Sequence, residues 1–246
     1  MKPPSVSVVV PLFNEEENVA ILQQEIREAL AGLDHELILV DDASTDATAS
    51  RVVRGAGVRL LRFSENAGQS AALLAGMRAA TAPRIALLDG DLQNDPRDLR
   101  LLIKAIDDGA DLACGYRAQR KDNALKRLTS RIANYVRSRF VGDGIRDTGC
   151  ALKVMRRECV QAIVPFKGFH RFIPALVKSA GFRIVELPVN HRPRQFGKSK
   201  YGLRNRALKA TTDMLGVRWL QARRIRADIV SEQQPTSLLD SLNSKI

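Results

Sequence analysis

Short apolar runs and segments of helical periodicity alternate along the first half of the chain. The apolar runs predict buried strands over Val6–Leu12, Glu36–Val40, Arg59–Phe63, Arg84–Leu88 and Asp111–Tyr116. The segments between them predict helices that begin after Asn14, at Ser44–Asp46, at Gln69 and at Pro96. Strands that alternate with helices predict an α/β fold with a mostly parallel, doubly wound central sheet.

This alternation becomes irregular after Tyr116. Residues 117–141 are basic and predict a helix, and later segments predict strands over Asp147–Val154 and Arg183–Val189 with a helix over Phe172–Ala180 between them. A long basic helical region follows over Leu203–Ile229. We therefore expect a globular domain over residues 1–202, basic amphipathic helices over 203–230 and a flexible polar tail over 231–246.

Polar side chains follow the predicted strands at the points where they end. The residues are Asn14, Asp41, Asp42, Asn66, Asp89 and Asp91. Ligands of open α/β sheets bind at the carboxyl ends of the strands, so these side chains mark the expected site.

The first strand is followed by Pro11-Leu12-Phe13-Asn14-Glu15-Glu16-Glu17, which contains no glycine. Dinucleotide-binding and P-loop proteins need glycines at this turn, because their backbone N–H groups approach phosphate closely. Three carboxylates would also repel a bare pyrophosphate. The turn therefore argues against both classes, although Glu16 and Glu17 are also ordinary residues for the start of a helix.

Asp89-Gly90-Asp91-Leu92-Gln93 follows a buried strand and contains two carboxylates and an amide. Such groups suit a hard divalent cation, Mg²⁺ or Mn²⁺, whose remaining ligands are phosphate oxygens and water. A solvated turn is the competing interpretation of this short motif. The polar ends of the neighbouring strands favour the metal site.

Composition and charge narrow the class of protein. The chain has 246 residues, of which 45% are apolar, and its three cysteines lack zinc-site spacing. We expect a globular protein that folds without disulfides in a reducing compartment, with no secretory signal and no membrane span. The net charge of +12 is uneven: residues 1–113 carry −7 and residues 114–246 carry +19. The basic half predicts a phosphate-bearing partner.

Several motifs together resemble the family 2 glycosyltransferases, which have the GT-A fold. They are VVVPLFNEEEN at Val8–Asn18, VDDASTD at Val40–Asp46, NAGQSAAL at Asn66–Leu73 and LDGDLQNDP at Leu88–Pro96. Asp147–Cys150, His170–Pro174 and HRPRQFGKSKY at His191–Tyr201 narrow the resemblance to the polyprenyl-phosphate glycosyltransferases, the group that includes dolichol-phosphate mannose synthase. The match runs from about Val6 to Arg226.

The resemblance implies a role for each matching residue. The base, ribose and sugar of a nucleotide-sugar donor would contact Pro11, Phe13, Glu15, Val40, Asp42, Asp89, Gly90, Arg194 and Lys200. Asp91 and Gln93 would hold Mg²⁺ or Mn²⁺. Arg117 and Arg131 would bind the phosphate of a polyprenyl phosphate acceptor, and together with Asp89 and Asp91 they form the expected catalytic set.

The implied reaction is a single displacement with inversion at the sugar. The acceptor phosphate is already anionic, so its oxygen needs no strong base, and the site must supply positioning and charge stabilisation. Asp147 is a conceivable base, but a structural carboxylate is the simpler interpretation.

The basic region Leu203–Ile229 interleaves seven Lys or Arg residues with large apolar ones, Trp219 among them. This pattern is typical of a helix on a membrane surface, while an ordinary packed helix with a basic outer face is the alternative. Many members of the resembling group continue into two membrane helices. Here we expect a cytoplasmic protein that binds peripherally to the inner face of the plasma membrane. A membrane protein partner for anchoring is compatible with this expectation.

Two other functions remain as alternatives. One is a family 2 enzyme whose first half binds the same kind of donor but whose acceptor is a soluble molecule or a polysaccharide instead of a lipid. A nucleic-acid-binding protein would explain the basic charge, but aromatic residues make up only 5% and no known binding motif is present, so nucleic acid is not an expected partner. The intact Asp-Gly-Asp-Leu-Gln motif argues against an inactive scaffold.

Overall fold

The structure is a computed structural model, and it describes residues 4–118, 137–194 and 204–224. The strands are β1 (Val6–Leu12), β2 (His35–Asp41), β3 (Val58–Arg62), β4 (Arg84–Leu87), β5 (Leu112–Arg117), β6 (Lys153–Arg156) and β7 (Ile184–Val189). The α-helices that lie wholly within the described residues are α1 (Val19–Ala29), α2 (Gln69–Ala79), α3 (Leu99–Asp107), α5 (Ile173–Ser179) and α6 (Arg204–Ala222). Short 3₁₀ helices are η1 (Pro96–Asp98), η2 (Arg157–Ala162) and η3 (Phe169–Arg171).

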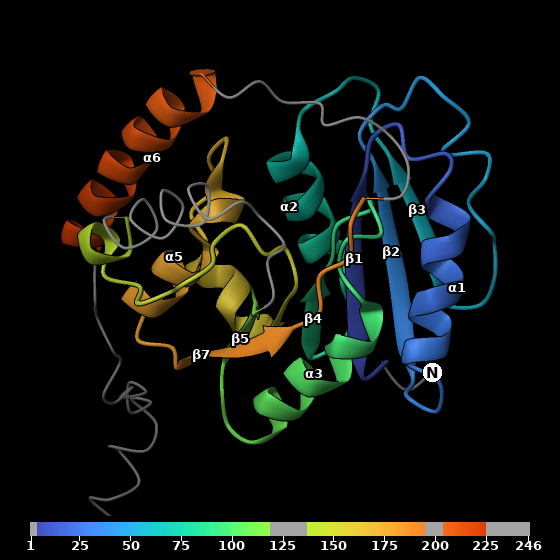
Figure 1. Cartoon of the computed structure of the whole chain (residues 1–246), viewed down its shortest axis with the longest axis horizontal. Helices are drawn as coiled ribbons and strands as arrows, with labels where there is room; N and C mark the ends of the chain where they lie inside the picture. Colours follow the sequence, from blue (N-terminus) through green and yellow to red (C-terminus); the bar gives the residue numbers. More distant parts are fainter. Residues whose placement is uncertain (1–3, 119–136, 195–203, 225–246) are drawn as a thin grey trace, which may run out of the picture.

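The seven strands form one sheet in the order β3-β2-β1-β4-β6-β5-β7 (Figure 1). All neighbouring pairs are parallel except those of β6, which is antiparallel to both β4 and β5. The mostly parallel α/β sheet that the sequence predicts is therefore confirmed. The reversed strand was not predicted, because strand direction is not visible in a run of only four residues.

The core is divided between the two faces of the sheet. Alternate residues of β1 point to opposite faces, so Val8 and Val10 pack with α1 and α3, while Val9 packs with α2 and α5. The helix α2 lies very close to the sheet, since a Cβ on Gly76 would come within 2.3 Å of the Val9 side chain. Full burial of one Val or Leu side chain contributes about 1.5–3 kcal/mol, so both layers stabilise the sheet.

The antiparallel direction of β6 determines which residues reach the functional edge. The strand begins at Lys153, which pairs with Leu87 of β4 and Cys114 of β5. Because β4 and β5 run the opposite way, the start of β6 lies beside their carboxyl ends. The reversed strand thus brings Lys153 to the same edge as Asp89.

Two of the predicted helix starts are wrong. The first helix begins at Val19 and not after Asn14, whose φ of 52° is left-handed. The Asn14 side chain instead accepts a hydrogen bond from the Thr45 N–H. No helix follows Ser44–Asp46 in the described chain, where the Asp46 carboxylate accepts from the Thr48 N–H and holds a turn. These polar side chains compete with helix formation by bonding the backbone directly.

The predicted strand over Asp147–Val154 is also too long, since only its last two residues belong to β6. Asp147 forms a turn by accepting from the Gly149 N–H. Most of the basic stretch 117–141 and both ends of the predicted helix Leu203–Ile229 lie outside the described residues, as does the tail 231–246. The three-part division of the chain stays a prediction.

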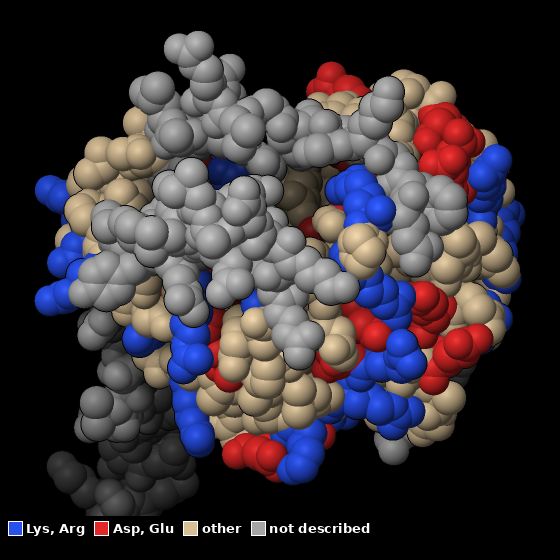
Figure 2. Space-filling model, viewed as in Figure 1, with Lys and Arg blue, Asp and Glu red and all other residues tan. Residues whose placement is uncertain are grey.

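Other expectations can be checked directly. The three cysteines, Cys114, Cys150 and Cys159, are buried and free, as the sequence predicts. Among the described residues, no helix has the length and apolar character required to span a membrane. In Figure 2, acidic and basic side chains are mixed over α1 and α3, whereas the edge where α6 lies shows basic side chains.

Candidate active site

Three turns at the carboxyl edge of the sheet contain residues with left-handed backbone. Asn14 follows β1, Ala43 follows β2 and Leu92 follows β4, with φ values of 52°, 57° and 59°. These are the only non-glycine residues of the described chain with positive φ. Such conformations carry strain that the surrounding structure must offset, and they concentrate at functional sites.

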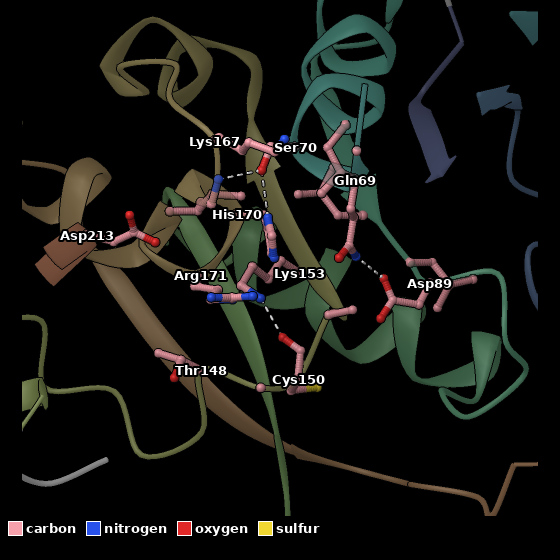
Figure 3. Close-up of a pocket in the computed structure, with 18 of the residues that line it drawn as sticks. Gln69, Ser70, Asp89, Thr148, Cys150, Lys153, Lys167, His170, Arg171 and Asp213 are labelled. Atoms are coloured by element: carbon pink, nitrogen blue, oxygen red, sulfur yellow. Dashed lines mark hydrogen bonds between the residues drawn. The ribbon is translucent and has the colours of Figure 1, made fainter. Parts of the chain in front are cut away.

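Asp89 lies two residues beyond β4 on the wall of a cavity (Figure 3). Its Oδ1 accepts a hydrogen bond from Nε2 of Gln69, at the start of α2, at 2.8 Å. Burial raises the pKa of Asp89 to about 6, and the nearby Asp91 charge adds to the rise. A carboxylate held in this way is ready for a cation or for sugar hydroxyls.

Asp91 is the expected metal ligand, and Arg194 contacts it directly. The Arg194 Nη2 lies 2.6 Å from the Asp91 Oδ2, and the Asp91 side chain is 13% exposed. The Gln93 N–H donates to the other carboxylate oxygen at 3.2 Å. The sequence predicts Arg194 near the donor, and the structure places it on the carboxylate of the expected metal site.

The segment that carries Arg194 is fastened to the domain. The Arg192 N–H donates to the Gln93 carbonyl at 2.8 Å. The Arg192 guanidinium also forms ion pairs with Glu25 of α1 at 2.8 Å and with Asp95 at 2.9 Å. Charge-assisted pairs of this kind fix a side chain more firmly than neutral bonds. This role of Arg192 could not be predicted from the sequence, because its partners are far away in the chain.

The residues around Asp91 have the chemistry of a Mg²⁺ or Mn²⁺ site. Asp89 and Asp91 place carboxylate oxygens beyond one strand end, and the predicted ligands Asp91 and Gln93 would leave the remaining positions of such an ion to phosphate and water. No group of three His, Cys, Asp or Glu side chains converges on a metal position within the described ranges. A protein site with one or two carboxylates fits an ion that arrives with a diphosphate.

Gly90 and Asp42 help to form the expected nucleotide-binding site. A Cβ on Gly90 would lie 2.8 Å from the Leu12 side chain and 3.2 Å from the Pro11 carbonyl, so only glycine allows this approach. The Asp42 carboxylate is buried and accepts from the N–H groups of Ala67 and Gly68 at 2.7 and 2.9 Å. Asp42 therefore orients the loop before α2, and its contact with a nucleotide stays a prediction.

The other expected nucleotide contacts lie at the same carboxyl edge. Pro11 and Val40 are neighbours in the pairing of β1 with β2, and Phe13 follows β1 directly. Val40 is fully buried in the core, so its side chain is not open to a ligand, whereas Phe13 is half-buried. The Glu15 carboxylate accepts from the Asn18 amide at 2.6 Å.

Arg117 is paired with Asp147. Two guanidinium nitrogens of Arg117 lie 2.7 and 2.8 Å from the two Asp147 oxygens, and both side chains are mostly buried. This bidentate pair supports the structural interpretation of Asp147 over a role as base. Arg131 and Lys200 lie outside the described residues, so their predicted roles stay predictions.

A second group of polar residues, not predicted individually, lines the cavity beside Asp89. The group comprises Ser70, Lys153, Lys167, His170, Arg171 and Asp213. His170 belongs to a motif noted in the sequence, but Lys153 was assigned to a buried strand. A single lysine inside the apolar run Cys150–Met155 was the signal that could have found it.

The comparisons with known proteins agree with this architecture. Residues 7–164 match the family described as Glycosyl transferase family 2. The chain therefore belongs to glycosyltransferase family 2, and the resemblance seen in its motifs is confirmed.

Two curated relatives and a solved structure give more detail. A dodecaprenyl-phosphate galacturonate synthase of Rhizobium johnstonii is 40% identical over 222 residues, covering 86% of this chain and 65% of the relative. An undecaprenyl-phosphate 4-deoxy-4-formamido-L-arabinose transferase of Photorhabdus laumondii subsp. laumondii is 34% identical, covering 80% of this chain and 62% of the relative. The chain thus spans less than two thirds of the length of either.

The solved structure is that of glucosyl-3-phosphoglycerate synthase from Mycobacterium tuberculosis in complex with Mn²⁺, uridine-diphosphate and phosphoglyceric acid. It aligns with a TM-score of 0.67 at 18% identity, covering 91% of this chain and 80% of that chain. At this identity the likeness concerns the fold, and the GT-A expectation is confirmed.

Proposed function

We propose that this protein transfers a sugar from a nucleotide-sugar donor to a polyprenyl phosphate, with inversion. The observation that carries the proposal is the polar, strained carboxyl edge of a family 2 domain, centred on Asp89 and Asp91. The names of both curated relatives support the polyprenyl phosphate acceptor. The neighbouring structure with uridine-diphosphate favours a UDP-sugar over a GDP-sugar.

The donor would bind across the ends of β1, β2 and β4. Asp91 and Gln93 would hold a Mg²⁺ or Mn²⁺ ion, which would neutralise charge on the departing diphosphate. Asp89, fixed by Gln69, would orient the sugar. Because Arg194 contacts Asp91 at 2.6 Å, donor binding would require the guanidinium to move from the carboxylate toward the diphosphate. Arg194 can then stabilise negative charge on the leaving group.

The acceptor phosphate would approach from the β5 side of the cavity, where Arg117 lies. Arg117 is already neutralised by Asp147, so it would contribute geometry more than net charge. The expected partner Arg131 would supply a second guanidinium. Positioning is the main requirement, since an anionic phosphate oxygen attacks without a strong base.

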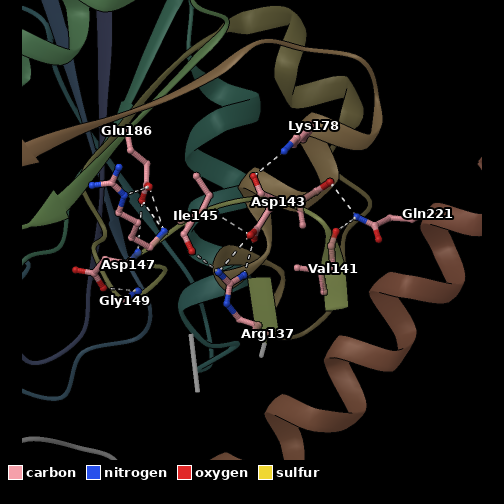
Figure 4. Close-up of polar contacts among 11 residues, drawn as sticks. Arg137, Val141, Asp143, Ile145, Asp147, Gly149, Lys178, Glu186 and Gln221 are labelled. Carbon is pink, nitrogen blue, oxygen red and sulfur yellow. Dashed lines mark hydrogen bonds and ion pairs between the residues drawn. The ribbon is translucent and has the colours of Figure 1, made fainter. Parts of the chain in front are cut away.

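The helix α6 is the proposed membrane contact. Leu215 and Trp219 are more than half exposed, and the Arg223 guanidinium stacks 5.0 Å from the centre of the Trp219 ring. On its inner side Val217 is buried, and the Gln221 amide donates to the Val141 carbonyl at 2.9 Å (Figure 4). The helix thus packs with one side and presents apolar and basic groups with the other, which suits an anionic membrane surface on the cytoplasmic side.

A donor panel tests the function. Purified protein, Mn²⁺ and a short-chain polyprenyl phosphate are combined with each UDP-sugar and GDP-sugar in turn, and glycolipid is measured after extraction into organic solvent. The proposal predicts transfer from one nucleotide sugar, abolished by EDTA. Transfer only to a soluble acceptor such as a sugar phosphate would contradict the lipid assignment.

Liposome flotation tests the membrane contact separately. Replacement of Arg218 and Arg223 by Gln should weaken binding to anionic liposomes, because each basic residue near such a surface contributes about 1 kcal/mol. Neutral liposomes should bind poorly in both cases. Equal flotation of the parent and the double variant would show that α6 is an ordinary packed helix.

A further inference from the structure

The cavity beside Asp89 has a volume of about 640 Å³ and extends away from the metal side of the site. The start of α2, the turn before β6 and the η3 region form its walls, and Asp213 of α6 also reaches it (Figure 3). Its size suits a sugar ring with an attached polar group. The charges on its wall indicate the kind of group that it binds.

Lys153 is a buried cation with too few partners. Lys153 is only 4% exposed, and its ammonium donates to the Cys150 carbonyl at 2.5 Å. An ammonium has three donors, and no carboxylate of the described residues lies within ion-pair distance of this one. Burial of an unpaired charge is costly, so folded proteins keep such a group only where something offsets it.

Arg171 brings a second cation to the same cavity. Its guanidinium has no carboxylate partner among the described residues, although it lies on the cavity wall. Asp89 and Asp213 are the acidic groups on that wall, and Asp89 is already bonded to Gln69. Neither cation therefore forms an ion pair with a carboxylate of the described residues, although the Lys153 charge acts on Asp89 across the cavity.

His170, between these cations and Ser70, remains neutral. Its Nδ1 lies 2.8 Å from the Ser70 hydroxyl, and that hydroxyl also accepts from the Gly168 N–H at 2.9 Å. Burial, together with the Arg171 and Lys153 charges, lowers the pKa of His170 to about 3. The ring points from Ser70 toward Lys153 and Arg171 in Figure 3 and gives the cavity a polar group without adding charge.

We propose that Lys153 and Arg171 form a subsite for one anionic group of a substrate, a carboxylate or a phosphate. The inference rests on the proposed function, which offers two sources of such a group. One is the carboxylate of a donor whose sugar is a uronic acid, and the other is the phosphate of the polyprenyl acceptor. Lys153 and Arg171 share the cavity wall with Asp89, which is expected to contact the sugar, whereas Arg117 is already neutralised by Asp147.

Three variants test the subsite. Lys153→Met and Arg171→Gln each remove one charge, and Lys104→Met is the matched control because Lys104 is exposed and paired with Asp108 on α3, away from the cavity. Calorimetry in Mn²⁺ gives the affinities for UDP, UDP-galacturonic acid and UDP-galactose. Initial rates give the KM for a short-chain polyprenyl phosphate, with the best donor of the panel.

The expected result is a selective loss. Affinity for UDP stays within about twofold in all variants. Removal of a charged hydrogen-bond partner, in contrast, weakens binding of the anionic substrate at least about tenfold. If the carboxylate is the ligand, the preference for UDP-galacturonic acid over UDP-galactose collapses. If the phosphate is the ligand, the KM for polyprenyl phosphate rises with unchanged donor binding. The Lys104→Met control changes neither quantity.

Thermal unfolding separates binding from structure. Because Lys153 is an unpaired buried charge, Lys153→Met should unfold at the same temperature as the parent or higher. A lower unfolding temperature with equal loss of every affinity would assign Lys153 to structure and overturn the inference. Parent-like affinities in both Lys153→Met and Arg171→Gln would overturn it as well. A parent that neither binds a nucleotide sugar nor glycosylates the lipid would instead refute the proposed function.

Discussion

Two carboxylates, one at the amino ends of the strands and one at the carboxyl ends, differ in their hydrogen-bond partners and in their pKa values. Glu36, near the start of β2, accepts hydrogen bonds from Ser7, from Thr81 and from Arg59 at 2.6–3.1 Å. Burial alone would raise its pKa, but these bonds lower it to about 2. Asp89, beyond the end of β4, has one amide partner, and burial raises its pKa to about 6.

The contrast separates stability from function within one layer of strands. At the amino edge four donors bond the two oxygens of the Glu36 carboxylate, so its ionised form is strongly stabilised. At the carboxyl edge Asp89 has a single amide partner, Lys153 forms no ion pair with a described carboxylate, and the turns at Asn14, Ala43 and Leu92 are strained. Sites that bind ligands often deviate from local optimisation in this way, and the rest of the fold offsets the cost.

The largest expected effect concerns the carboxyl edge. Asp91→Asn should lower turnover at least about 100-fold, by comparison with the loss of one electrostatic stabiliser in other enzymes. Asp107→Asn, at an exposed ion pair with Arg84, is the control and should leave turnover unchanged. Initial rates with Mn²⁺ and polyprenyl phosphate measure both. Full activity of Asp91→Asn would contradict the metal assignment.

Glu36→Gln, at the amino edge, should lower stability and leave donor binding unchanged. The variant loses charge-assisted hydrogen bonds from the buried Ser7 and from Thr81, so we expect about 1–3 kcal/mol of lost unfolding free energy. Urea denaturation measures the loss, and calorimetry should show unchanged donor affinity. A variant of normal stability with poor donor binding would remove the distinction between the two edges.

The pH dependence of stability should depend on Glu36. Its pKa is lower in the folded chain, about 2 against an ordinary 4.5, so its contribution is present above pH 4.5 and is lost as the pH falls toward 2. The shift corresponds to on the order of 3 kcal/mol. Urea titrations from pH 6 to 3 should show a shallower decline for Glu36→Gln than for the parent. Parallel curves would show that other carboxylates dominate.

Asp89→Asn should give the smallest effect, and it should raise the unfolding temperature, whereas Glu36→Gln lowers the free energy of unfolding. The ionised carboxylate is buried beside Asp91, and a neutral amide of equal size removes that repulsion. We expect the unfolding temperature at pH 7.5 to rise by about 2–4 °C, a typical gain from 1 kcal/mol in a chain of this size. Scanning calorimetry checks it. A clear decrease would mean that Asp89 supports the fold.

The sequence predicts the fold wherever local pattern decides it. The apolar run of β1 and the Ala-rich α2 were located within one residue of their bounds, and Asp89 and Asp91 were placed correctly at a strand end. Features that depend on distant residues were missed. The direction of β6 and the pairing of Arg117 with Asp147 arise from contacts across 30 or more residues, which no local spacing reports.

One binding measurement tests the central claim most directly, namely that the carboxyl edge binds the donor and the amino edge holds the fold. UDP is titrated calorimetrically into the parent, Asp91→Asn and Glu36→Gln, each with Mn²⁺ and with EDTA. The account predicts binding to the parent and to Glu36→Gln only with Mn²⁺, and at least about tenfold weaker binding to Asp91→Asn. Binding that is independent of Mn²⁺ and equal in all three proteins would contradict it.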